Sequence, residues 1–132
     1  MNAAEQKNNL SVTLLKLGRA QEALQEVAGT DEVFAAAGDV RRQGMALNNQ
    51  AAALQDLKRA DEALAAYERS AHLLGEAGEG ELRAIALKAA AAIHLRGGRL
   101  TESGLKMLGA MGSSLRPTLL ERVLRSLLRR QR

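Results

Sequence analysis

Hydrophobic residues in the first part of the chain recur every three or four positions, which is the spacing of one face of an α-helix. In the segment LSVTLLKL the apolar face consists of Leu10, Leu14 and Leu17. Gly18 follows and favours the end of that helix, because glycine adopts the left-handed conformation of a helix C-terminus without strain. After this glycine the next apolar face consists of Ala20, Ala23, Leu24 and Val27. A turn this short predicts that the two helices pack antiparallel.

The same spacing continues along the chain and predicts about seven helices and no strands. One helix is expected between Gly18 and Asp39, and the side chain of Asp39 can cap the helix after it. The remaining helices are expected at about residues 39–57, 59–74, 81–96, 102–111 and 117–132. β-Branched residues are scarce and the one proline is Pro117, so the composition agrees with a chain of long helices.

A short phrase returns at an interval of about 40 residues, which points to a stacked repeat array. It reads GRAQEAL at residues 18–24, KRADEAL at 58–64 and GRLTESG at 98–104. A single helix pair cannot bury its apolar faces alone, so neighbouring pairs must stack on one another.

These positions resemble the tetratricopeptide repeat family, in which each repeat is a pair of antiparallel helices with small residues where they cross. The matching positions are the turn residues Gly18, Lys58 and Gly98, and the small residues Ala23, Ala63 and Ser103 in the second helices. The period resembles the longer-helix variety found in kinesin light chains and bacterial regulators. The resemblance implies an all-α, right-handed superhelical array of about three antiparallel helix pairs within residues 1–114, at about 4–38, 39–78 and 79–112. Helix pairs of the HEAT type are the structural alternative.

Residues 115–132 are expected to form a basic amphipathic helix that caps the array. Pro117 suits the first turn of a helix, and Thr118 and Glu121 have the spacing of a capping box. The formal net charge of the chain is +4, and this segment alone carries six arginines and one glutamate. Its alternative role is that of a basic adaptor surface for an acidic partner or an anionic membrane.

The resemblance also implies that the first helix of each pair lines a concave groove for a peptide or a helix. In the family an asparagine there often holds the backbone of an extended peptide, and an amide suits this role because it both donates and accepts. Asn49 matches that place best, and Asn9 is its equivalent one repeat earlier. The other implied groove residues are Lys16, Asn48, Gln55, Lys88 and Arg96. The alternative is that these side chains are solvated or bond locally.

The expected function is therefore a non-catalytic protein–protein interaction, without a cofactor, a metal ion or catalytic residues. The chain has no cysteine, and its two histidines, His72 and His94, fall on different expected helices. His94 stands where the repeat has a packed aromatic residue, which favours a position at the edge of the core. The segment GEAGEG is not followed by Lys and Ser or Thr, so it is not a phosphate-binding loop.

The expected partner is a protein or peptide. A self-associating scaffold is the alternative, because the apolar face of the first helix has no helix before it to cover it. Nucleic acid is not expected, since Phe34 and Tyr67 are the two aromatic residues of the chain and base stacking has no platform. A membrane partner is not expected either. The chain lacks an apolar run of roughly 18 residues and a secretory signal pattern, so a cytoplasmic location is expected.

Overall fold

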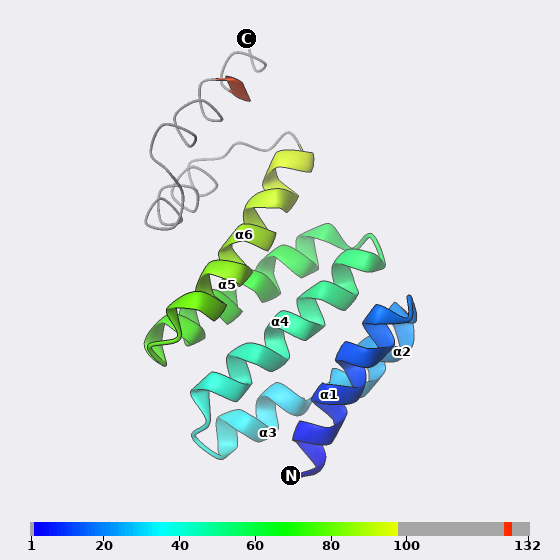
Figure 1. The fold of residues 1–132 in the computed structure, drawn as a ribbon, viewed down its shortest axis with the longest axis vertical. Coiled ribbons are helices and arrows are strands. Elements are labelled where there is room, and N and C mark those ends of the chain that lie inside the picture. The colour runs from blue at the N-terminus through cyan, green and yellow to red at the C-terminus, as the bar shows by residue number, and fades with distance from the viewer. Residues whose placement is uncertain (1, 98–125, 128–132) are drawn as a thin grey trace.

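The computed structural model describes residues 2–97 and 126–127, and this part of the chain is helical, without a strand (Figure 1). The helices are α1 (Ala3–Lys16), α2 (Ala20–Val27), α3 (Thr30–Ala36), α4 (Val40–Asp56), α5 (Ala60–Glu76) and α6 (Gly80–Arg96). The predicted all-α class is thus confirmed for the described residues. None of their helices is both long enough and apolar enough to cross a membrane. The turn at Gly98, the helix expected at 102–111 and most of the capping segment 115–132 lie outside the described residues.

Two helices begin at side chains that satisfy free backbone amides. Asn2 precedes α1, and its Oδ1 accepts a hydrogen bond from the backbone N–H of Glu5 at 2.8 Å. The Glu5 carboxylate accepts one in return from the N–H of Asn2, at 3.3 Å. Asp39 precedes α4 and accepts from the N–H of Arg42 at 3.0 Å, which confirms the predicted cap. Each bond removes one of the unpaired donors that a helix start leaves, so these local residues determine where the helices begin.

The stretch between Gly18 and Asp39 contains two helices, so the prediction of a single helix there is wrong. Gly29 lies between α2 and α3 with a left-handed φ of 79°, which interrupts the helix. The Oγ1 of Thr30 donates to the carbonyl of Val27 at 2.7 Å across this break. A glycine inside a helical pattern can be tolerated or can end the helix, and the hydrophobic spacing does not distinguish the two. The break allows the side chain of Phe34 in α3 to be buried.

The turns that end α1, α3, α4 and α5 share one backbone geometry and recur every 20 residues or so. At each turn one residue has a φ between 64° and 73°, and these residues are Gly18, Gly38, Lys58 and Gly78. The next amide donates to the carbonyl five residues earlier, at 2.9 Å in all four turns. The interval of about 40 residues in the sequence therefore spans two such turns, with one helix between most of them and two, α2 and α3, between Gly18 and Gly38.

Lys58 is the one described residue other than glycine with a positive φ, and we expect Lys58→Gly to stabilise the protein. A side chain with a Cβ atom costs about 1 kcal/mol in the left-handed region, so the gain in unfolding free energy should approach that value. Urea unfolding measures it. The matched control is Gly78→Lys, where a Cβ meets nothing within 4 Å and the backbone cost acts alone. A stabilising effect of Gly78→Lys, or none of Lys58→Gly, would contradict this explanation.

The largest core cluster joins α4, α5 and α6 and consists mainly of alanine. Its buried members are Ala51, Leu54, Ala63, Tyr67, Ala71, Ala86, Leu87, Ala90 and Ala91. Two of the three predicted crossing residues, Ala23 and Ala63, are completely buried, as expected for small residues between close helices, and the third, Ser103, lies outside the described residues. Such side chains let backbones approach: the Oγ of Ser70 in α5 donates to the carbonyl of Gly44 in α4 at 2.7 Å. Small residues thus determine how closely the helices pack.

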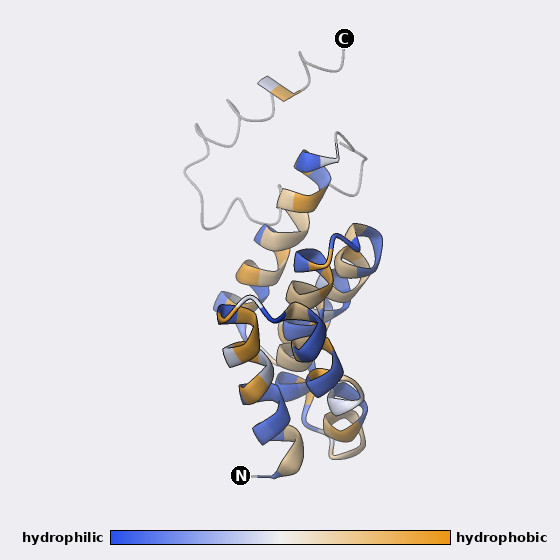
Figure 2. Cartoon of the chain, turned by 90° about the vertical axis from the view of Figure 1, so that its right-hand side faces the viewer, coloured by the Kyte–Doolittle hydropathy of each residue, from blue (hydrophilic) through white to orange (hydrophobic). Residues whose placement is uncertain are grey.

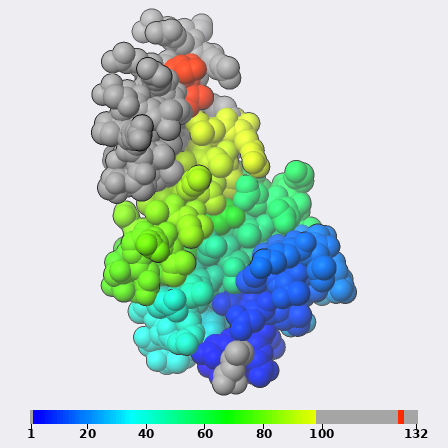
Figure 3. Space-filling view, in the orientation of Figure 1, coloured from blue at the N-terminus to red at the C-terminus, as the bar shows by residue number. Residues whose placement is uncertain are grey.

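Helices α1, α4 and α6, which the predicted repeat makes the first helices of its pairs, follow one another along the long axis of the molecule (Figure 1). α4 packs against α2, α3 and α5, and α5 packs against α6. The space-filling view shows the same order as bands that touch in sequence (Figure 3). Among the described helices, α4 therefore lies between α5 on one side and α2 and α3 on the other.

The predicted apolar face of α1 is buried at Leu14 but not at Leu10 and Leu17, which are 45% and 63% exposed. The buried side of this helix consists instead of Ala4, Asn8, Ser11 and Leu14. Its second half is the more hydrophobic in Figure 2. The difference arises because α1 packs against α2, α3 and α4 on one side, and no described helix lies on the side of Leu10 and Leu17.

Candidate functional site

The predicted groove residues lie on three helices, in the order expected from the repeat. Asn9 and Lys16 are on α1, Asn48, Asn49 and Gln55 are on α4, and Lys88 and Arg96 are on α6. The residues on α1 and α6 are exposed, whereas the three amides of α4 are half-buried. The side chains of the α4 amides are therefore the ones in contact with neighbouring helices.

Asn49 links α1 and α4. Its Nδ2 donates to the Oδ1 of Asn8 at 2.6 Å, and Asn8 itself is 7% exposed. This bond leaves the oxygen and the second N–H of the Asn49 amide for a ligand. Local bonding, which was the alternative for this residue, therefore accounts for part of its capacity.

Asn48, the neighbour of Asn49, is in a different situation. Its side-chain oxygen is buried and has no hydrogen-bond partner among the described residues. An unpaired acceptor in such a place costs about 1–3 kcal/mol. Because the residue as a whole is half-buried, rotation of its amide can bring this oxygen to the surface, where a donor from outside the chain would remove that cost.

Gln55, near the end of α4, is held by α5. The hydroxyl of Tyr67 donates to its Oε1 at 2.9 Å. Burial raises the pKa of Tyr67, and the nearby charge of Asp56 raises it further, so the hydroxyl keeps its proton at neutral pH. This bond takes one of the two acceptor sites of the Gln55 oxygen and orients the amide, so that its nitrogen is available to bind a ligand as a donor.

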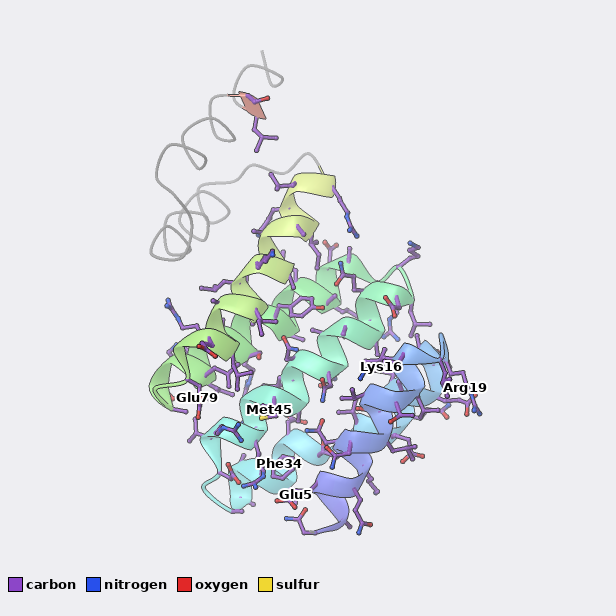
Figure 4. The ribbon with its side chains drawn as sticks, viewed as in Figure 1. Glu5, Lys16, Arg19, Phe34, Met45 and Glu79 are labelled. Carbon is purple, nitrogen blue, oxygen red and sulfur yellow. The ribbon has the colours of Figure 1, made fainter. Side chains whose placement is uncertain are left out.

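Some of the predicted groove residues line one of two hollows on the surface, but no single hollow contains them all. One, of about 250 Å³, is bordered by Asn9 together with Glu5, Phe34 and Met45. The other, of about 330 Å³, is bordered by Gln55 and Arg96 at the far ends of α4 and α6. Figure 4 shows Glu5, Phe34 and Met45 grouped at one end, with Lys16 at the other end of α1. Lys16, Asn48, Asn49 and Lys88 border neither hollow.

Arginines that the sequence analysis did not single out join the helices beside the first hollow. Arg42 pairs with Glu5 of α1 at 3.0 Å and with Asp39 at 2.8 Å, and Arg41 pairs with Glu79 before α6 at 2.9 Å. The hydrogen bonds from Arg42 hold the pKa of Asp39 below its usual value. The signal was present in the sequence, since Glu5 and Arg42, like Arg41 and Glu79, are opposite charges about one period apart.

His94 is buried, as expected for a residue in a packed aromatic position, with 7% of its surface exposed. Neither ring nitrogen has a hydrogen-bond partner in the described part of the chain, and the closest carboxylate oxygen, of Glu68, is 3.9 Å from Nε2. His72 is on the surface of α5 beside Glu76. Within residues 2–97 and 126–127, no group of three or more potential ligand side chains could hold a metal ion.

No protein-family model matches this chain, and no curated protein or solved structure matches it either. The resemblance to tetratricopeptide repeats therefore stays a prediction from the residues quoted above.

Proposed function

We propose that this chain is a non-catalytic interaction module of tetratricopeptide type, a right-handed superhelical array whose first helices bind an extended peptide of a partner protein. The groove would be formed by α1, α4 and α6, and the second helices would support it from behind. The observation that carries the proposal is the side-chain oxygen of Asn48 on α4, which is buried and has no hydrogen-bond partner in the part of the chain that the structure describes. It is an acceptor for a backbone N–H, which every peptide residue except proline provides.

The surroundings of Asn48 favour an extended peptide with at least one apolar side chain. Met45 is half-buried one turn before it on α4, and Ile85, its equivalent on α6, is 56% exposed. Both are apolar and occupy the same place in the repeat, so they offer contact surface to ligand side chains. The bond between Asn8 and Asn49 holds α1 and α4 together. Because these side chains are already ordered, peptide binding loses less conformational entropy.

We expect Asn48→Ala to weaken peptide binding by about fivefold or more, since one lost hydrogen bond is worth roughly 0.5–1.5 kcal/mol and more when its partner stays buried. Its melting temperature should stay equal or rise, because the unpaired oxygen disappears. Peptides selected from a random phage-displayed library with the full chain provide the ligands, and isothermal titration calorimetry measures the affinities.

Asn49→Ala serves as the contrasting variant. It leaves the oxygen of Asn8 buried without its donor, so it should lower the free energy of unfolding by about 1–3 kcal/mol. Gln25→Ala, an exposed change on α2, is the neutral control. If Asn48→Ala binds the selected peptides as the parent does, or if no peptide is selected, the proposal is wrong.

Self-association is the second candidate, and the exposed Leu10 and Leu17 on one side of α1 favour it. Light scattering of the full chain, made before the peptide selection, separates the two. A dimer that Leu10→Ser with Leu17→Ser converts to a monomer would support a scaffold, and a parent monomer at all concentrations would exclude it.

A further inference from the structure

The larger hollow described above does not include Asn48 or Asn49, but it shares Gln55 and Arg96 with the predicted groove residues. It is formed where α4 and α6 end and α5 begins, and its volume is about 330 Å³. Leu64 of α5 and Ile93 of α6 supply apolar walls. A hollow of this size lies at the lower end of ligand-binding pockets, which points to a small organic molecule.

The polar part of the lining consists mostly of donors. Lys58 and Arg96 are exposed cations, and neither pairs with a carboxylate in the described part of the chain. Gln55 can add an N–H, because the bond from Tyr67 to its oxygen orients the amide. The one carboxylate in the lining, Asp61, has an interaction partner of its own. Among the described residues, the lining therefore carries two cations without a carboxylate partner and one carboxylate.

His94 lies in the same lining and is more than nine-tenths buried. Both of its ring nitrogens lack hydrogen-bond partners among the described residues. Buried polar groups are nearly always paired, with the protein, with water or with a ligand. Among the described residues, the lining thus combines an imidazole without a hydrogen-bond partner and two cations without a carboxylate partner.

We infer that this hollow binds a small organic anion, specifically a carboxylate on a short hydrocarbon chain. Lys58 and Arg96 hold the carboxylate, with the Gln55 amide as a further donor, and the hydrocarbon lies against Leu64 and Ile93. Arginine suits the role because its guanidinium matches a carboxylate with two parallel hydrogen bonds. The inference does not rest on peptide binding at Asn48, which does not line this hollow, so either can fail without the other.

The test compares hexanoate, hexanol and hexylamine as ligands of the full chain, with NMR chemical shifts of the backbone amides as the measurement. Hexanoate should give saturable shifts at the residues of the hollow, at millimolar concentration. Hexanol and hexylamine share its chain but not its charge, and they should bind at least about fivefold more weakly, given the strength of hydrogen bonds between charged groups. Added salt should weaken hexanoate binding in parallel.

Two substitutions at exposed positions test separately whether binding depends on the positive charge and on the space in the hollow. Arg96→Gln should weaken hexanoate binding about fivefold or more, and Ala60→Phe should abolish it by filling the space. The matched controls are Arg69→Gln and Ala65→Phe, exposed changes on α5 outside the lining, which should leave it intact. Equal binding of hexylamine, an unchanged affinity in Arg96→Gln or the absence of saturable shifts would each overturn the inference.

Discussion

Phe34→Ala should lower the free energy of unfolding by about 3–5 kcal/mol, the largest effect we expect from a single substitution. Phe34 is 2% exposed and forms one core cluster with Ala4, Val27 and Ala46. Its ring thus joins α1, α2, α3 and α4. The buried apolar residues around the ring are alanines and one valine, which are too short to fill the space it would leave, so little of the lost contact can be recovered.

The effect should be cooperative, because α3 has seven residues and a helix of that length is not stable alone. Urea unfolding followed by circular dichroism measures it. Val33→Ala is the control, since the adjacent Val33 is 53% exposed on the same helix. Val33→Ala should change the unfolding free energy by no more than about 0.5 kcal/mol. Equal losses in the two variants would show that Phe34 does not anchor α3.

Gly44→Ala should destabilise the protein by about 1–3 kcal/mol, although alanine is the better helix former by up to about 1 kcal/mol. A Cβ atom at Gly44 would lie 2.8 Å from Cγ and 2.9 Å from Cδ2 of Leu74. Leu74 is 1% exposed and cannot move aside without disturbing its neighbours. The Ser70 carbonyl, 3.4 Å from the same Cβ, and the Ser70 hydroxyl bound to Gly44 prevent α5 from moving away.

The control for this prediction is Gly80→Ala, because a Cβ at that first residue of α6 meets nothing within 4 Å. It should be neutral or stabilising, as helix propensity alone predicts. The double variant Gly44→Ala with Leu74→Ala should lose less stability than the sum of its single changes, since shortening Leu74 makes room for the new methyl group. A Gly44→Ala protein as stable as Gly80→Ala would mean that α4 and α5 do not cross this closely.

The candidate site was predictable in its residue types and its helices, but not in its bonds. The period of the sequence placed Asn48, Asn49 and Gln55 on one first helix, where the structure has them. Asn48 and Asn49 are adjacent in the chain, yet Asn49 meets Asn8 and the oxygen of Asn48 meets no partner among the described residues. Adjacent residues on a helix point about 100° apart, so they face different neighbours. Which neighbour each one faces depends on how α4 is rotated against α1.

Features that depend on neighbouring residues were determined by the sequence itself. The turn at Gly18 and the cap at Asp39 need a backbone preference or a side chain within a few residues, and both are in place. Small residues at a regular interval, such as Ala23 and Ala63, likewise mark helix crossings, because no larger side chain fits there.

Tertiary structure decided the features for which the chain has more than one local solution. Gly29 breaks the helix because the break lets α3 pack Phe34 against Ala4 and Ala46, residues that are distant in the sequence. Leu10 and Leu17 match the helical pattern as well as Leu14 does, but the side of α1 that they occupy receives no described neighbour. Hydrophobic spacing identifies a helix and its apolar residues. Whether those residues are buried depends on which other helices pack against them, and this is determined by the energy of the whole fold.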